Sequence, residues 1–183
     1  MLQVVRSRPS EDEARVDAAR YWLDSRPLAG RATCGDFAGC FPVGSERLAI
    51  VVGDVAGRGP AAGAAAHAVF ERARRELRSR RPLAEAVLGL GRLARCGFAE
   101  RTVRWDARSV LVAVTDGVTE ARGSDAGRPH FFGSFAVARA FASARRARVD
   151  PARAIGEAAR RHANGRSRDD ATVLVVRSGR PLS

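Results

Sequence analysis

Four short motifs in this sequence place an aspartate beside a glycine or a second aspartate. Each motif stands at the boundary of an apolar, β-branched segment of the kind that forms strands. Strands of one sheet bring their ends together, so carboxylates that are far apart in the sequence can meet at one rim. The motifs are Gly35-Asp36, Gly53-Asp54, Asp116-Gly117 and Asp169-Asp170.

A cluster of carboxylates predicts bound cations. Carboxylates at close range repel one another, and burying them without a partner is costly, so such a site needs counter-charge. Cys34 and Cys40 flank the first motif, which leaves metal ligation or redox sensitivity as a minor alternative for them. No set of His or Cys ligands accompanies the four motifs, which disfavours zinc, and hard oxygen ligands favour Mg²⁺ or Mn²⁺. Two such ions, bridged by a carboxylate, can generate hydroxide and polarise a phosphoryl group. Taken singly, each aspartate is better explained as a turn residue or a helix cap, so the hypothesis depends on the set.

The segments that must position these aspartates alternate between strands and helices. Residues 37–43 and 48–52 predict a hairpin, and Gly59-Pro60 opens a helix that runs to about Ser79. Residues 109–115 and 171–177 predict two further buried strands.

The remaining segments are predicted from capping and turn signals. A capping-box pattern of Ser10 with Glu13 predicts a helix over 10–24. Residues 123–129 are expected to form a polar loop, and residues 132–146 a helix that buries Phe135 and Phe141. Asp150-Pro151 begins a helix, and Asn164-Gly165 ends it.

The composition of the sequence limits the class of protein to which the chain can belong. The chain has 183 residues, of which 45% are hydrophobic and 28% charged, as expected of one globular domain. No apolar run approaches the roughly 20 residues that span a bilayer, and the N-terminus has no apolar stretch of the signal-peptide type. We therefore expect a cytoplasmic protein without a membrane segment. Its three cysteines form no CxxC pattern and are expected to be inert thiols in a reduced compartment.

The formal charge of +12 raises nucleic-acid binding as a function. All the basic side chains other than His are Arg, which together with the abundant Ala and Gly is typical of GC-rich coding. The arginines are scattered along helices and are not interleaved with aromatic residues, so nucleic acid is disfavoured as a partner. A basic face for an acidic or phosphorylated partner remains the alternative.

Three stretches of the sequence resemble, in the same order, the metal-dependent protein serine/threonine phosphatases (type 2C-like, PPM). They are GDFAGCFPVGSERLAIVVGDVAGRGPAA, SVLVAVTDGVTEAR and RDDATVLVV, and the resemblance extends over about residues 28–177. It is strongest to the bacterial branch of the stage II sporulation phosphatase and of partner-switching stress pathways. The resemblance implies an α+β fold, an antiparallel β-sandwich flanked by helices in α-β-β-α layers.

The same resemblance implies site residues and chemistry. Asp36, Asp54, Asp116 and Asp169 match the family's acidic metal ligands, with Asp54 as the bridging one, and the main-chain carbonyl of Val55 is a further ligand. The cofactors would be two Mn²⁺ or Mg²⁺ ions, and a metal-bound water would attack phosphoserine or phosphothreonine of a protein. An anti-sigma-factor antagonist is the substrate suggested by the family. Arg58 stands at a basic position of the motif, where it would contact phosphate or serve only at the surface.

The sequence departs from the family at three places. Cys34 replaces a glycine, and Ala38-Gly39 replaces an aromatic residue followed by an acidic one. Several strands that normally follow the helix at 60–79 are missing near residues 90–95. The fold is therefore expected to be a reduced sandwich, and a homodimer that covers its exposed edges is one hypothesis.

These observations predict a single phosphatase-like domain over residues 1–183, with an N-terminal helix and lead-in at 1–27 and a phosphatase core at 28–183. Because all four aspartates are retained, we expect an active hydrolase. The alternatives are a catalytically impaired phosphatase-like module that binds a phosphoprotein or kinase partner, and a basic nucleic-acid-binding protein.

Overall fold

The computed structural model describes residues 19–28, 30–43, 47–57, 59–79, 106, 108–125, 128–166 and 168–178. The elements follow in the order β1 (Ala19–Arg26), β2 (Asp36–Val43), β3 (Arg47–Asp54), α1 (Pro60–Arg78), β4 (Val110–Val114), α3 (Asp116–Thr119), β5 (Arg122–Asp125), β6 (Arg128–Phe131), α4 (Gly133–Ala147), α5 (Pro151–His162) and β7 (Ala171–Ser178).

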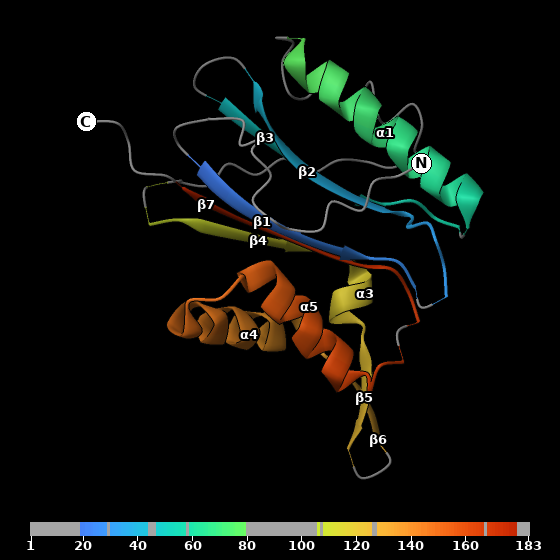
Figure 1. The fold of residues 1–183 in the computed structure, drawn as a ribbon, viewed down its shortest axis with the longest axis vertical. Helices are drawn as coiled ribbons and strands as arrows, with labels where there is room; N and C mark the ends of the chain where they lie inside the picture. Colours follow the sequence, from blue (N-terminus) through green and yellow to red (C-terminus); the bar gives the residue numbers. More distant parts are fainter. Residues whose placement is uncertain are drawn as a thin grey trace.

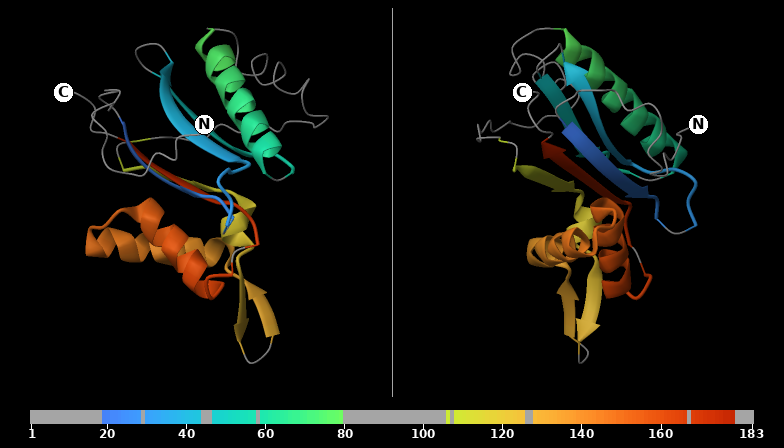
Figure 2. Two further views of the ribbon diagram at one scale, coloured as in Figure 1. Left: turned by 45° about the vertical axis from the view of Figure 1, so that its right-hand side comes forward. Right: turned by 60° about the vertical axis from the view of Figure 1, so that its left-hand side comes forward.

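Two antiparallel sheets form the centre of the molecule, with helices on their outer sides (Figure 1). One sheet has the order β1-β7-β4, and the other is the β2-β3 hairpin. Helix α1 packs on β2 and β3, whereas α5 packs on β7 and β1, with α4 beside it (Figures 1 and 2). Strand β2 contacts β7 and β1 across the interior. The predicted α+β sandwich with α-β-β-α layers is therefore confirmed.

Strand β7 forms the centre of the hydrophobic core. Its residues from Thr172 to Val176 are fully buried, as expected of a strand covered on both faces. Val173 and Val175 pack against Ile155 of α5 and Val118 of α3. Because side chains alternate along a strand, Leu174 and Val176 face the opposite way, toward β2.

Helix α5 begins and packs as its sequence predicts. The Asp150 carboxylate accepts a hydrogen bond from the Arg153 main-chain N–H at 3.0 Å, which satisfies one of the free donors of the first turn. A Cβ at Gly156 would collide with the Asp24 carboxylate, so glycine permits the close approach of α5 to β1. Beyond the helix, Asn164 and Gly165 both have positive φ angles, 51° and 73°, and close the turn.

The hairpin at β2-β3 is confirmed, and Phe70 of α1 covers it. The Phe70 ring packs edge-on against Phe37 and Phe41, with centroid distances of 6.2 Å in both cases. A Cβ at Gly39 would collide with the same ring. The glycine that stands at a usually acidic position thus makes room for Phe70.

The predicted helix at 10–24 is wrong where the structure describes it, because residues 19–26 form β1. Pairing with β7 runs from Ala19–Ser178 to Arg26–Ala171, about 150 residues away in the sequence. The local spacing of Tyr21 and Trp22 suggested a helix, but their type suits a strand, and the non-local pairing decides the outcome. Residues 10–18 lie outside the described residues.

Two further predictions were wrong. The expected loop at 123–129 contains the antiparallel pair β5-β6, which extends away from the sandwich (Figure 2). Phe135 of α4 is 78% exposed, whereas Phe141 packs against the core cluster as predicted. Helices α1 and α4, the start of α5 and the strands at 110–114 and 171–178 agree with the predicted elements. The predicted burial is confirmed for β7, whereas β4 is only partly buried and its Leu111 is 37% exposed.

Candidate metal centre

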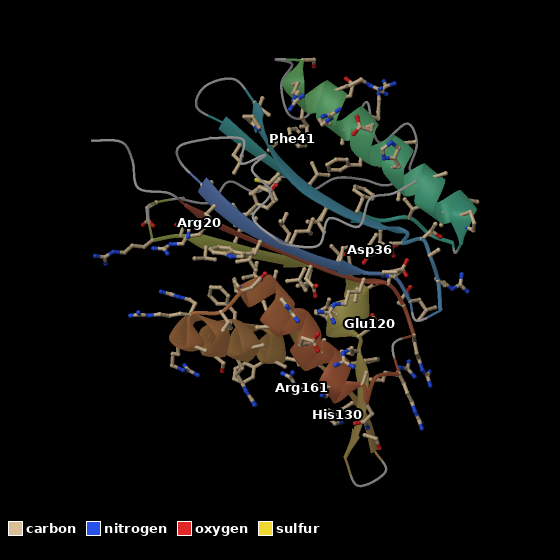
Figure 3. The ribbon with its side chains drawn as sticks, viewed as in Figure 1. Arg20, Asp36, Phe41, Glu120, His130 and Arg161 are labelled. Atoms are coloured by element: carbon tan, nitrogen blue, oxygen red, sulfur yellow. The ribbon has the colours of Figure 1, made fainter. Side chains whose placement is uncertain are left out.

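Asp36 and Asp54 face each other at one end of the β2-β3 hairpin. They are register partners, the first residue of β2 and the last residue of β3. Asp36 is only 2% exposed and lies between the two sheets (Figure 3), whereas Asp54 is exposed. The hairpin therefore brings two carboxylates that are 18 positions apart to one edge, one of them inside the protein and one at its surface.

Buried threonines fix the Asp36 carboxylate. The Thr115 hydroxyl donates a hydrogen bond to Asp36 Oδ2 at 2.7 Å and accepts one from the Thr172 main-chain N–H at 2.9 Å. The Thr172 hydroxyl is in turn 2.8 Å from the Ser25 hydroxyl. This network joins β1, β2, β7 and the end of β4, so the position of Asp36 is set by the whole sandwich. Thr115 and Thr172 were not singled out from the sequence, although each stands within two residues of an acidic motif.

The pKa values of both carboxyl groups are raised. Burial raises the pKa of Asp36 to about 6, against the hydrogen bonds from Thr115 and Thr172, and the charges of Asp54 and Asp170 add to it. Burial also raises the pKa of Asp54, followed by the charges of Asp116, Asp169 and Asp170. Within the part of the chain that the structure describes, neither Asp36 nor Asp54 forms an ion pair with a basic side chain. Among those residues, no basic side chain therefore neutralises the Asp36 and Asp54 carboxylates.

Asp116 and Asp169 approach the same end from the other sheet. Asp116 is the first residue of α3, directly after β4, and Asp169 precedes β7; both are exposed. A Cβ at Gly117 would collide with the Asp170 carbonyl and lie 3.4 Å from the Asp169 Cβ, so these two segments are in close contact. Since both charges act on Asp54, the structure brings the four predicted aspartates to one end of the sandwich.

Asp170 has a separate role, which the sequence analysis missed. Its Oδ1 accepts a hydrogen bond from the Leu28 main-chain N–H, and its Oδ2 accepts one from the Gly35 N–H, each at 2.6 Å. The carboxylate thus ties the loop between β1 and β2 to the start of β7. Asp169 lies in a bend before β7, and the charges of both aspartates act on Asp54, so the Asp169-Asp170 pair in the sequence did not indicate which of the two has this structural role.

Val55 lies beside this group, with its carbonyl oxygen close to Gly35. A Cβ placed on Gly35 would be 3.0 Å from the Val55 oxygen, 3.5 Å from Asp54 Oδ1 and 3.6 Å from Asp170 Oδ2. The Val55 N–H also donates to the Gly35 carbonyl at 3.2 Å. Glycine at position 35 therefore keeps open a space lined by oxygen atoms. Arg58 lies outside the described residues.

The donor chemistry of this end fits Mg²⁺ or Mn²⁺, because its side-chain and main-chain donors are oxygen atoms. The raised pKa values of Asp36 and Asp54 also mean that a cation would relieve existing repulsion. Among the residues that the structure describes, however, no group of three or more His, Cys, Asp or Glu side chains could hold a metal ion. The acidic side chains converge without forming a closed set of ligands.

The two described cysteines have features of inert thiols. Cys34 is buried beside the acidic end, and burial, followed by the charges of Asp170 and Asp36, raises its thiol pKa to about 12. Burial raises the pKa of Cys40 to about 11. Both are free, and neither supplies thiolate at neutral pH. Cys96 lies outside the described residues.

An α-β-β-α sandwich with acidic residues converging at one end places the chain among the metal-dependent protein phosphatase folds. A sequence-family model described as Stage II sporulation protein E (SpoIIE) matches residues 74–179. The chain belongs to this family, as its motifs suggested. No curated protein matches the chain by sequence.

Two solved structures share the fold. The structure of the PP2C phosphatase domain and a fragment of the regulatory domain of SpoIIE from Bacillus subtilis is similar with a TM-score of 0.72 and 14% identity, over 90% of this chain and 65% of that one. The crystal structure of the RsbU and RsbW domains of Rv1364c from Mycobacterium tuberculosis gives a TM-score of 0.68 and 18% identity, over 91% and 63%. The chain thus spans less than two thirds of the length of either structure.

No helix in the described ranges is long and apolar enough to cross a membrane.

Proposed function

We propose that this chain is a protein phosphatase domain that hydrolyses phosphoserine or phosphothreonine with the help of two Mn²⁺ or Mg²⁺ ions. The observation that carries the proposal is the convergence of carboxylates at the acidic end, where Asp54 Oδ1 and Asp170 Oδ2 both border the space beside Gly35. Burial raises the pKa of Asp54, and the charges of Asp116, Asp169 and Asp170 add to this effect. Acidic residues from four separate segments act on one another there, and the family to which the chain belongs supports the same reaction.

In this proposal Asp36, Asp54, Asp116, Asp169 and the Val55 carbonyl hold the ions. The bound ions would supply the positive charge that lowers the pKa of water and polarises a phosphoryl oxygen. Asp54 lies at the centre because it is influenced by the acidic groups of both sheets. Asp36 is held by Thr115, so it can bind without losing its position. Arg58 is proposed as a phosphate contact, on the strength of the motif alone.

The decisive experiment compares Asp54→Asn with Asp106→Asn, a matched change at an exposed aspartate in the turn that precedes β4. Phosphate release from p-nitrophenyl phosphate and from a phosphoserine peptide would be followed with Mn²⁺. We expect Asp54→Asn to lose more than about 100-fold in kcat/KM, since even outer-shell partners of a metal cost about 10- to 100-fold. Asp106→Asn should keep the full rate. Equal rates for wild type and Asp54→Asn would overturn the proposal.

The proposed substrate is a phosphorylated anti-sigma-factor antagonist in a partner-switching pathway. The resemblance of the motifs to phosphatases of such pathways suggests it, and the structurally similar Rv1364c chain joins an RsbU domain to an RsbW domain. A phosphotyrosine peptide serves as the control substrate. A preference for it over the phosphoserine and phosphothreonine peptides would contradict the substrate class.

A phosphatase-like module without catalysis is the second candidate. It is favoured by the absence, among the described residues, of a group of three side chains that could hold a metal. It is also favoured by a length below two thirds of the similar structures. Calorimetric titration with Mn²⁺ and Mg²⁺ separates the two candidates: heat of binding that disappears in Asp54→Asn supports the enzyme, and silence supports the module.

Homodimerisation remains a proposal that rests on exposed sheet edges. Among the strands that the structure describes, β1 and β4 are the outer strands of their sheet, and Tyr21 and Leu111 on them are 46% and 37% exposed. Sedimentation at increasing protein concentration tests it, and a monomer throughout would count against it.

A further inference from the structure

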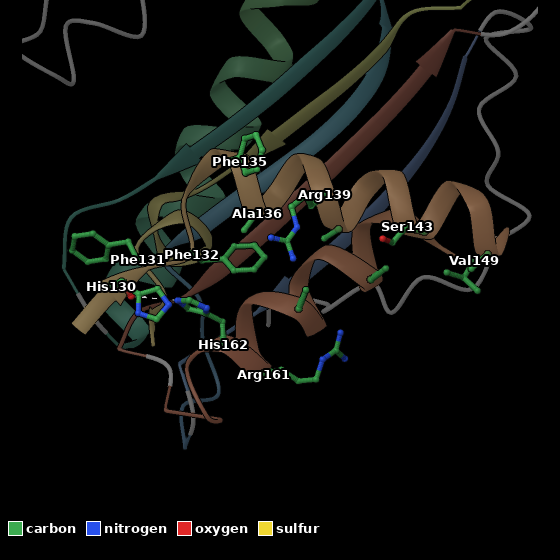
Figure 4. A pocket seen from close by; sticks show the side chains of 15 residues that line it. His130, Phe131, Phe132, Phe135, Ala136, Arg139, Ser143, Val149, Arg161 and His162 are labelled. Carbon is green, nitrogen blue, oxygen red and sulfur yellow. Dashed lines mark hydrogen bonds between the residues drawn. The ribbon is translucent and has the colours of Figure 1, made fainter. Parts of the chain in front are cut away.

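A groove lies between α4 and α5 on the outer side of the molecule (Figure 4). Two of its lining residues, His130 and Arg161, lie apart from Asp36 of the acidic end (Figure 3). It has a volume of about 640 Å³. Phe132 and His162 lie at one end and Val149 at the other, with Arg139 on α4 and Arg161 on α5 between them (Figure 4). Small side chains such as Ala140 and Ala158 line it, which leaves the space between the helices open. We call this space the α4–α5 groove.

The rim of the α4–α5 groove exposes large apolar side chains. Phe135 is 78% exposed, Val149 54% and Phe131 51%, and all three line the groove. Single exposed apolar residues are common on protein surfaces, but a group of them around one hollow marks an interaction site. The sequence analysis predicted Phe135 to be buried, but its side chain is exposed and is not part of the hydrophobic core cluster.

The charge of the α4–α5 groove is positive. Arg139 and Arg161 line it, together with His130 and His162, and none of the lining residues is acidic. Helix α4 contains no Asp or Glu, and α5 contains only Glu157, which is engaged with Arg26 of β1 and with Arg160. The groove therefore combines an apolar rim with basic side chains that face no local acidic partner in the lining.

We propose that the α4–α5 groove binds an amphipathic, acidic helix of a partner protein. An amphipathic helix presents apolar side chains at i, i+3, i+4 and i+7 to such a groove. Its apolar face would contact Phe135 and Val149, and acidic side chains along its flanks would pair with Arg139 and Arg161. A flat anionic membrane fits less well, because the site is a hollow between two helices. The inference does not depend on phosphatase activity.

The test uses the full 183-residue chain and a designed probe. The probe is a fluorescein-labelled peptide of about 18 residues, built from Leu, Ala and Glu, with leucines at i, i+3, i+4 and i+7. One control peptide replaces each Glu by Lys, and another scrambles the order of the residues. We expect binding of the acidic peptide by fluorescence anisotropy, binding at least tenfold weaker for both controls, and weakening by salt.

Protein variants locate the binding site. Arg139→Glu with Arg161→Glu should weaken acidic-peptide binding at least tenfold, and Phe135→Ser should weaken it severalfold. Arg153→Glu is the matched control, because Arg153 is an exposed residue of α5 that does not line the groove. Circular dichroism checks that each variant is folded.

Three results would overturn the inference: no binding of the acidic peptide, equal binding of the scrambled peptide, or equal weakening by Arg153→Glu. Phe135-dependent binding to phosphatidylglycerol vesicles without peptide binding would instead assign the surface to a membrane. Since phosphate release is measured separately with Asp54→Asn, failure here leaves the proposed reaction untouched.

Discussion

Strand β7 passes through two regions that differ in almost every physical respect. Along its length, Val173 and Val175 pack against Ile155 in a fully apolar layer beneath α5. At its start, Asp170 and Thr172 belong to a polar end that contains the nearly buried Asp36. Burial raises the pKa of Asp36 to about 6, whereas hydrogen bonds from Arg160 and Arg26 lower the pKa of Glu157 on the helical side. The one carboxylate of α5 is thus paired with arginines, whereas carboxylates gather without basic partners around Asp36 and Asp54 among the described residues.

The comparison indicates how the fold divides its tasks. The apolar layer supplies most of the free energy of folding, because burial of apolar area is the dominant favourable contribution. The acidic end opposes folding through burial and repulsion of carboxylates, and it is held in place by the threonines and by Asp170. Because the buried and neighbouring carboxylates of the acidic end lower the stability of the fold, we expect this end to serve a function. Variants in the apolar layer should therefore lose stability, whereas variants of the proposed metal ligands at the acidic end should lose metal binding.

Ile155→Ala should have the largest effect on stability. Ile155 is fully buried against Val173 and Val175, and removing its side chain leaves a cavity. We expect a loss of about 3 kcal/mol in the free energy of unfolding, measured by urea denaturation. Arg153→Ala, on the exposed face of the same helix, is the control and should cost less than about 0.5 kcal/mol. If Mn²⁺ affinity of the folded Ile155→Ala protein fell as strongly as its stability, the two regions would not be separable.

Asp170→Ala and Asp169→Ala should distinguish two roles at the acidic end, a structural role for Asp170 and a metal-binding role for Asp169. Asp170→Ala leaves the Leu28 and Gly35 N–H groups without their acceptor, which should cost about 2 kcal/mol in unfolding free energy. Asp169→Ala removes an exposed carboxylate that accepts a hydrogen bond from the Asp170 N–H at 3.0 Å, so it should cost less stability than Asp170→Ala, while calorimetric Mn²⁺ affinity falls. The reverse pattern, with Asp169→Ala the more destabilising variant, would refute the assignment of the two aspartates.

How far the sequence predicts this molecule depends on whether its signals are local. The β-branched run of β7 and the Asp150-Pro151 cap are local signals, and both elements were predicted correctly. Strand β1 was not, because its strand identity depends on pairing with residues some 150 positions away. Exposure of Phe135 likewise depends on which side of α4 faces α5, which helical spacing alone does not determine.

The acidic residues of the candidate site could be proposed from the sequence because aspartates at strand ends meet by geometry. The hydrogen bonds that hold these residues in place could not be predicted from the sequence. The hydrogen bonds of Thr115 with Asp36 and of Asp170 with Leu28 join residues separated by 79 and 142 positions, and no pattern along the chain encodes them. The coupling of Asp54 to its acidic neighbours similarly emerges only when both sheets are in place.

Glu157→Gln should have the smallest effect and a pH dependence that identifies its cause. The hydrogen bonds from Arg160 and Arg26 lower the folded-state pKa of Glu157 below its usual 4.5, so its stabilising contribution is present above pH 4.5 and is lost as the pH falls through the folded-state value. Because the carboxylate is near the surface, we expect Glu157→Gln to cost only about 0.5 kcal/mol at pH 7. The cost should shrink when the pH is lowered from 7 to an acidic value below the folded-state pKa of Glu157, where the wild-type carboxyl group becomes protonated as well. Urea denaturation of both proteins at the two pH values measures this, and a cost that grew on acidification would show that Arg26 and Arg160 do not stabilise the charged form.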